Sequence, residues 1–149
     1  MSYHTWTTYG YGFCVDDIDT TPERLLKLAE MNPEVLEDVR EYLDDIFDGE
    51  EYKDEDLTLE DFDDLEGGYC ERGVTYVLLH VIENELSLIY ADDYNGTPYI
   101  LYGPHYPWSM PHKEKNLSEE DVTKIFAKYI NVLTDQDVDI DYQSVENGG

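Results

Sequence analysis

Apolar and polar positions along the chain change period several times, and each change predicts a new element. Residues 3–15 place Tyr, Thr, Phe or Val at every second position, which is typical of a strand with one packed face. Thr21-Pro22 and Asn32-Pro33 each join a capping side chain to a proline suited to the first helical turn. The pattern therefore predicts one strand followed by two helices.

The second of these helices carries the clearest amphipathic pattern. Its apolar positions form one continuous stripe: Val35, Leu36, Val39, Tyr42, Leu43, Ile46 and Phe47. Acidic residues fill the other positions and continue through a loop at 48–56 and a short capped segment at 59–65. Residues 21–66 are therefore expected to form an acidic helical block.

The second half of the chain begins with patterns typical of strands. Residues 74–82 are nearly all apolar and rich in β-branched side chains, which predicts a central strand. A second strand is expected over 86–91, and the Asn95-Gly96 turn signal leads into a third over 99–102. Together they predict a β-meander over residues 73–103.

Ser118, followed by three acidic residues, predicts the start of a last helix over residues 118–133. Acidic and apolar residues then alternate, which predicts a terminal edge strand over 137–145. Tight turns join strands in antiparallel pairs. We therefore expect residues 1–149 to form a single α+β domain. Its mostly antiparallel sheet of about five strands would carry helices packed on one face.

Net charge changes this picture most. The 149 residues include nine basic and 36 acidic side chains, a formal net charge of −27. A small domain ordinarily carries a net charge of magnitude about 2–8, and an excess of one sign destabilises the compact state. The 41% of hydrophobic and 13% of aromatic residues still provide for a core, so a folded acidic domain is expected rather than a disordered tail.

The acids concentrate between Glu34 and Glu66, where 33 residues include 17 acids and two bases. Like charges three or four residues apart on a helix cost about 0.2–0.5 kcal/mol a pair. A functional negative surface is therefore expected, with a merely solvated helix face as the alternative. The residues expected to contact a partner here are Glu37, Asp38, Glu41, Asp44, Asp45, Asp48, Glu50, Glu51, Asp54, Glu55, Asp56, Asp61, Asp63 and Asp64.

Three further partner contacts are expected near the end of the chain. Asp137, Asp139 and Asp141 would project from one face of the terminal strand at intervals of about 6.6 Å. A calcium loop is the rival interpretation, with ligands at Asp135, Asp137, Asp139, Asp141 and Glu146. Ile140 stands where such a loop needs glycine. We therefore expect no metal site and no cofactor, with adventitious divalent binding on the acidic surface as an alternative.

The remaining candidates are aromatic or catalytic. Trp108 lies in a proline-containing loop at 102–112 and would serve either as an interface anchor or as a plug over the open end of the sheet. Gly10 and Gly12 lack the third glycine of a dinucleotide fingerprint. His80 falls in the predicted central strand and is expected to be a core histidine whose polar atoms are satisfied by partners. No motif brings nucleophile, base and orienting group together, so no catalytic residue is expected.

In size, charge and its acidic block from Glu34 to Glu66, the chain resembles small, very acidic proteins of bacteriophages and mobile elements. Several of these are anti-CRISPR or anti-restriction inhibitors that mimic nucleic acid. The resemblance implies a non-enzymatic inhibitor of a basic nucleic-acid-handling protein, such as a CRISPR effector or a nuclease, in the cytoplasm of a bacterial host.

Two other functions are left as alternatives. One is an immunity protein or antitoxin that neutralises a basic nuclease toxin, and the other is a divalent-cation-binding or enzymatic domain. Direct binding to nucleic acid or to a membrane is not expected, because phosphates and anionic lipids would be repelled by this surface.

Overall fold

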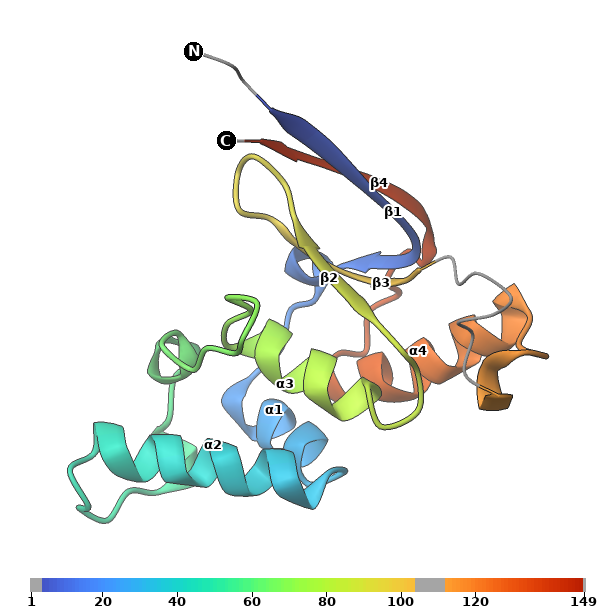
Figure 1. Cartoon of the computed structure of the whole chain (residues 1–149). Helices are drawn as coiled ribbons and strands as arrows, with labels where there is room; N and C mark the ends of the chain where they lie inside the picture. The colour runs from blue at the N-terminus through green and yellow to red at the C-terminus, as the bar shows by residue number, and fades with distance from the viewer. Residues whose placement is uncertain (1–3, 104–111, 149) are drawn as a thin grey trace.

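Over residues 4–103 and 112–148, which the computed structural model describes, the chain forms four α-helices and a four-stranded antiparallel sheet (Figure 1). The strands are β1 (Thr5–Cys14), β2 (Ile89–Asp92), β3 (Pro98–Tyr102) and β4 (Asp141–Gly148). Their order in the sheet is β2-β3-β1-β4. The predicted α+β class and antiparallel pairing are confirmed, but the described sheet has four strands rather than about five.

The three helices predicted from their caps are confirmed. They are α1 (Pro22–Ala29), α2 (Pro33–Ile46) and α4 (Glu119–Leu133). At the start of α1, the hydroxyl oxygen of Thr21 accepts a hydrogen bond from the Arg24 backbone N–H at 3.3 Å. Such a bond satisfies a donor that the first turn leaves without an intrahelical partner.

The predicted central strand over 74–82 is wrong, because these residues form helix α3 (Val74–Ile82). A run that is apolar at nearly every position has no period, so it does not separate a buried strand from a buried helix. Helix α3 packs against α1, α2, α4 and β3, which explains why most of its residues are apolar and buried. The predicted meander over 73–103 is therefore a helix followed by the β2–β3 hairpin.

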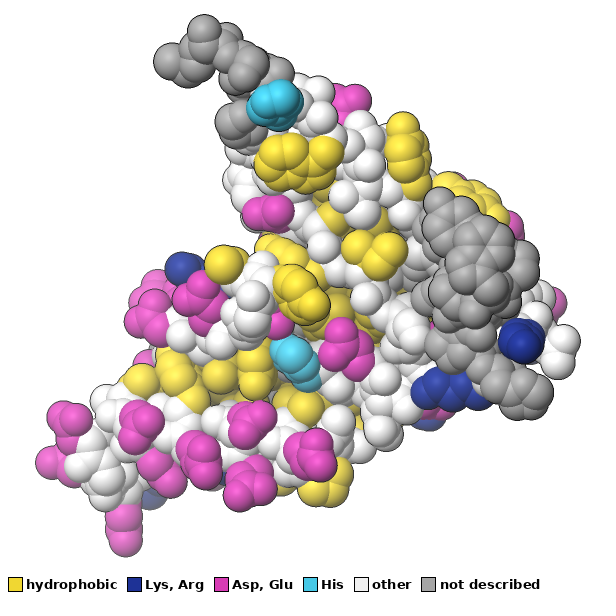
Figure 2. Space-filling view, in the orientation of Figure 1, with side chains coloured by type: hydrophobic (Ala, Val, Ile, Leu, Met, Phe, Trp, Pro, Cys, Tyr) yellow, Lys and Arg dark blue, Asp and Glu magenta, His cyan; other side chains and the backbone are white. Residues whose placement is uncertain are grey.

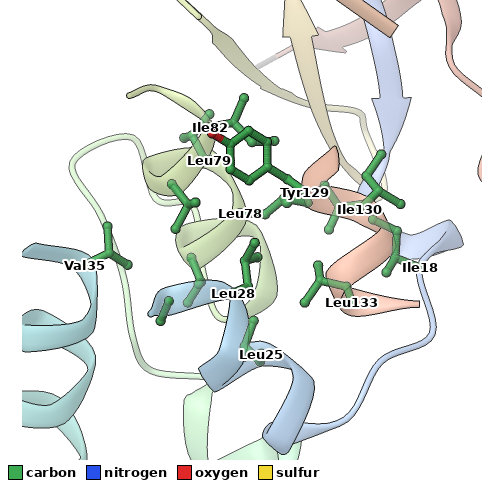
Figure 3. Close-up of a cluster of buried hydrophobic side chains, with 14 of the residues drawn as sticks. Ile18, Leu25, Leu28, Val35, Leu78, Leu79, Ile82, Tyr129, Ile130 and Leu133 are labelled. Atoms are coloured by element: carbon green, nitrogen blue, oxygen red, sulfur yellow. The ribbon is translucent and has the colours of Figure 1, made fainter. Parts of the chain in front are cut away.

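The main core lies between the helices and one face of the sheet. Leucines of α1, α3 and α4 converge there, among them Leu28, Leu78 and Leu133 (Figure 3). Phe13 of β1 meets Phe126 of α4 edge to face, with ring centroids 5.2 Å apart. Each such fully buried side chain stabilises the fold by about 1.5–3 kcal/mol, so this contact firmly joins α4 to the sheet.

The opposite face of the sheet carries a smaller cluster made by the strands themselves, with Ala91, Leu101 and Val145 at its centre. The backbones of β1 and β3 come close together at Gly12, where a Cβ would lie 2.0 Å from the carbonyl oxygen of Ile100. The glycine predicted as part of a strand therefore permits close approach of β1 and β3.

The two edge strands also meet directly. The Asn147 side-chain amide of β4 donates a hydrogen bond to the Asp92 carbonyl oxygen of β2 at 2.9 Å. Since β2 and β4 are the first and last strands of the sheet, this contact requires the sheet to curl.

The terminal strand begins later than predicted. Asp137 and Asp139 precede β4, so the expected row of three acids on one strand face is wrong and only Asp141 belongs to the strand. Pairing with β1 stops at Gly12 opposite Asp141, while the rest of β1 pairs with β3 alone. Val138 and Ile140 are half-buried against the main core. The alternation of acidic and apolar residues before β4 therefore reflects burial of the apolar side chains and not strand pairing.

Two other expectations depend on these regions. Glu146 lies within β4 opposite Thr7, and Asp141 lies in the same strand, so these two residues do not wrap a calcium loop. Trp108 lies outside the described residues.

Candidate partner-binding surface

Helix α2 lies at the end of the molecule away from the projecting ends of β1 and β4 (Figure 1). It buries one side only, through Val35, Val39 and Leu43. Of the 17 acids from Glu34 to Glu66, 16 are exposed and Asp61 is half-buried. Figure 2 shows acidic side chains in a row over α2, at the lower left of the view.

We call this region the acidic surface. Its part on α2 and just beyond it consists of Glu37, Asp38, Glu41, Asp44, Asp45 and Asp48. Its second part follows in the loop and two short 3₁₀ turns, η2 (Asp54–Asp56) and η3 (Leu59–Phe62), and consists of Glu50, Glu51, Asp54, Glu55, Asp56, Asp61, Asp63 and Asp64. The structure thus places the predicted residues of the block on one helix and the segment that follows it.

Arg40 attaches this loop to α2. Its guanidinium donates two hydrogen bonds to the Asp54 carboxylate, at 2.8 and 3.0 Å, and a third to the Tyr52 hydroxyl at 3.3 Å. Tyr52 in turn stacks on Phe47, with ring centroids 4.9 Å apart. The bonds from Arg40 hold the pKa of Asp54 below its ordinary value of 3.8. Asp54 therefore fixes the loop and has less free charge for a partner.

Asp61 also has a local structural role, because its carboxylate accepts the Thr58 backbone N–H at 2.7 Å before η3. The acids at the C-terminal end of α2 differ from these two. Among the residues that the structure describes, none forms an ion pair with Asp44, Asp45 or Asp48. These three exposed carboxylates are the part of the acidic surface best suited to an external cation.

His80 has polar partners, as expected of a satisfied histidine, but it is not a core residue. It lies on α3, half-buried, with Nε2 2.9 Å from Oε1 of Glu71 and Nδ1 3.5 Å from Oε2 of Glu83. Glu71 is fully buried and also accepts the Tyr69 backbone N–H at 2.9 Å. No pattern in the sequence signals this pairing, since Glu71 is one of 36 acids and lies nine residues before His80.

The His80 cluster connects to the acidic surface through Tyr76. The rings of Tyr76 and His80 lie 4.4 Å apart, and the Tyr76 hydroxyl donates to Asp38 of α2 at 3.4 Å. Burial, with a contribution from Glu71, raises the pKa of Glu83, while His80 opposes that rise. Each polar group of the cluster thus has a protein partner, and the contacts join α2, α3 and the loop before α3.

Two further observations limit the chemistry of the described residues. Within 4–103 and 112–148, no three His, Cys, Asp or Glu side chains gather in a way that could hold a metal ion. None of the helices found there is long and apolar enough to cross a membrane.

Comparison of the chain with protein-family models, with curated proteins and with solved structures gives no match.

Proposed function

We propose that this protein is a non-enzymatic inhibitor that binds a basic nucleic-acid-handling protein through the acidic surface. The observation that carries the proposal is the row of exposed acids on α2 and just beyond it, of which Asp44, Asp45 and Asp48 form no ion pair among the described residues. Like charges at helical spacing weaken a helix. A surface that retains them against this cost suits a partner that supplies the missing positive charge.

The density of charge supports mimicry of nucleic acid. Helix α2 places six acids and one base in its 14 residues. Such a helix is about 21 Å long. Duplex DNA of that length carries about 12 phosphates. The helix thus reaches about half that density alone, and the acids of the following loop add to it.

The partner is a protein with a basic channel for nucleic acid, and the place of action is the bacterial cytoplasm. A CRISPR effector or a bacterial nuclease has a basic channel that ordinarily holds phosphates, and the acidic surface would compete for it in the bacterial cytoplasm. Nuclease toxins offer the same channel, so an immunity role uses the same surface. A basic channel would relieve the repulsion among these carboxylates. Salt screens the attraction between the two surfaces, so binding should be strongest at low salt.

The test is a cleavage assay with a panel of purified CRISPR effectors and bacterial nucleases, toxin nucleases included. An inhibited enzyme is then used to measure Kd at about 50 and 200 mM NaCl, with DNA as competitor. We expect Kd to rise steeply with salt and DNA to displace the protein. A Kd unchanged over this range would contradict charge mimicry.

Two variants of equal charge locate the contact. Asp44→Asn, Asp45→Asn and Asp48→Asn together should weaken binding by about tenfold or more, because each removes an exposed charge from the proposed contact. Asp16→Asn, Asp17→Asn and Asp19→Asn remove the same charge from exposed positions outside α2 and outside the predicted contacts. This control should retain binding within about threefold, since screened charges outside the contact matter little. Equal losses would mean that net charge, rather than this surface, governs binding.

A further inference from the structure

Three tyrosines from neighbouring strands stand in a row on the helix-facing side of the sheet. Tyr102 of β3 pairs in register with Tyr11 of β1, and Tyr11 pairs on its other side with Tyr142 of β4. Directly opposed residues project from the same face of a sheet. The rings of Tyr11 and Tyr142 meet edge to face, with centroids 5.1 Å apart and planes at 71°.

This row forms one wall of a cleft of about 440 Å³ between the sheet and the start of α4. Tyr9, two residues before Tyr11 on the same face of β1, extends that wall. The other wall is contributed by Leu117, Ser118, Glu119 and Val122. A cleft of this volume is large enough to receive one long side chain of a partner.

Hydrogen bonds hold the polar tips of Tyr11 and Tyr142. The Tyr11 hydroxyl lies 2.7 Å from the Thr123 hydroxyl of α4. The Tyr142 hydroxyl donates to the Glu119 carboxylate, which fixes an anionic group beside the aromatic wall. Tyr9 and Tyr142 nevertheless remain 62% and 65% exposed. The cleft thus presents accessible aromatic rings next to an oriented carboxylate.

A cation is the occupant that these features favour. The faces of aromatic rings are electron-rich and attract a cation, and a nearby carboxylate adds a charge-assisted hydrogen bond. The net charge of −27 attracts cations and repels anions. An apolar occupant would instead remove water from Glu119 without replacing its hydrogen bonds. Among biological cations, a planar guanidinium stacks on aromatic rings. It is also more weakly hydrated than an ammonium, so it costs less free energy to remove from water.

We propose that this tyrosine cleft is a second contact site, which takes up an arginine side chain of the partner protein. Its guanidinium lies on the tyrosine rings and hydrogen-bonds to Glu119. That the arginine belongs to a nucleic-acid-handling partner rests on the proposed function. Arginine uptake by the cleft itself is a property of this chain alone.

The test is an NMR titration of the protein with the peptide acetyl-Gly-Arg-Gly-amide, without any partner protein. We expect saturable shifts at the resonances of Tyr9, Tyr11, Tyr142 and Glu119. The same peptide with citrulline, which has arginine's shape without its charge, should give shifts at least about fivefold weaker, because cation–π attraction and the charge-assisted bond are lost. Equal shifts with both peptides, or shifts concentrated on α2, would overturn the proposal.

Matched variants separate the cleft from general attraction to an acidic protein. Glu119→Gln and Asp19→Asn each remove one exposed negative charge. The first should weaken arginine-peptide binding by about fivefold or more, and the second should change it by less than about twofold, because only Glu119 lies in the cleft. Tyr142→Leu, which removes an exposed ring, should weaken binding as well, with far-ultraviolet circular dichroism confirming the fold.

The two proposals fail separately. Arginine-peptide binding that survives both Glu119→Gln and Tyr142→Leu overturns the cleft proposal while inhibition through α2 stands. Loss of binding in these variants supports the cleft proposal even where no nuclease or effector in the panel is inhibited.

Discussion

The Nε2 atom of His80 lies 2.9 Å from Oε1 of Glu71, a carboxylate whose side chain is completely shielded from solvent. A buried carboxylate is costly unless hydrogen bonds replace its lost hydration. Glu71 obtains them from His80 and from the Tyr69 backbone N–H, and Gly67 passes close beside both side chains. The loop before α3 is therefore arranged around this one carboxylate.

Replacing Gly67 by alanine should lower the free energy of unfolding by about 1–3 kcal/mol. A Cβ there would lie 1.9 Å from Oε1 of Glu71 and 3.1 Å from Nε2 of His80. Gly68→Ala is the matched control, because no atom lies within 4 Å of the point that its new Cβ would occupy. Urea unfolding of both variants measures the difference, and equal stabilities would contradict this account of the loop.

Gly12→Ala should be at least as damaging, by about 3 kcal/mol or more, because its new Cβ would meet backbone rather than a side chain. The carbonyl oxygen of Ile100 lies 2.0 Å from that position. Strand β1 would have to move away from β3 and loosen the Phe13–Phe126 contact beneath it. Amide hydrogen exchange should show faster exchange along β1 and β3, whereas protection that is unchanged would rule out this close approach.

Asp54→Asn should destabilise the protein by about 0.5–1 kcal/mol at neutral pH, because it removes the carboxylate that binds Arg40 through two hydrogen bonds. Asp44→Asn, with the same change of charge, should leave stability equal or slightly higher since it only relieves repulsion. Thermal or urea unfolding of the two variants side by side makes the comparison. A destabilised Asp44→Asn would show that the α2 acids support the fold.

The contribution of Asp54 also depends on pH in a defined direction. Because Arg40 lowers its folded-state pKa below the ordinary 3.8, the ionised carboxylate stabilises the folded protein above that pH. That contribution is lost as the pH falls through the folded-state pKa. The stability gap between the wild-type protein and Asp54→Asn should therefore close in acid, and a gap that widens below pH 3.8 would contradict the sign.

Added salt should raise the melting temperature at neutral pH. The exposed carboxylates of α2 repel one another across one turn of helix, and salt screens that repulsion. The variant with Asp44, Asp45 and Asp48 all changed to Asn should show a weaker dependence on NaCl. Differential scanning calorimetry over a salt series tests this, and a melting temperature that falls with moderate NaCl would mean that attractive ion pairs dominate.

Local signals predicted much of this fold. The caps at Thr21, Asn32 and Ser118 indicated three helices, because capping is a property of a few neighbouring residues. Residues 74–82 were misassigned because the burial of most of them depends on which other elements surround the helix, and an apolar run without a period does not show this. The exposure of the α2 acids was predictable, since the apolar stripe through Val39 and Leu43 determines which side of the helix faces inward.

The polar and aromatic sites could not be predicted in the same way. The tyrosine cleft depends on the register of β1 with both β3 and β4, which joins Tyr11 to residues about 90 and 130 positions later in the chain. The pairing of Glu71 with His80 likewise required α3 to be a helix. The sequence showed abundant tyrosine and acid, but only long-range pairing decides which of them meet.

The bond from Asn147 to Asp92 has a consequence for how this protein behaves in a crowded solution. Exposed outer strands are templates on which further chains add, and many proteins rely on charge to prevent such growth. Here the end of each outer strand is directed toward the other, so this part of the ladder is not presented to a neighbouring molecule. The protein therefore does not depend on its carboxylates at that end of the sheet to keep copies apart.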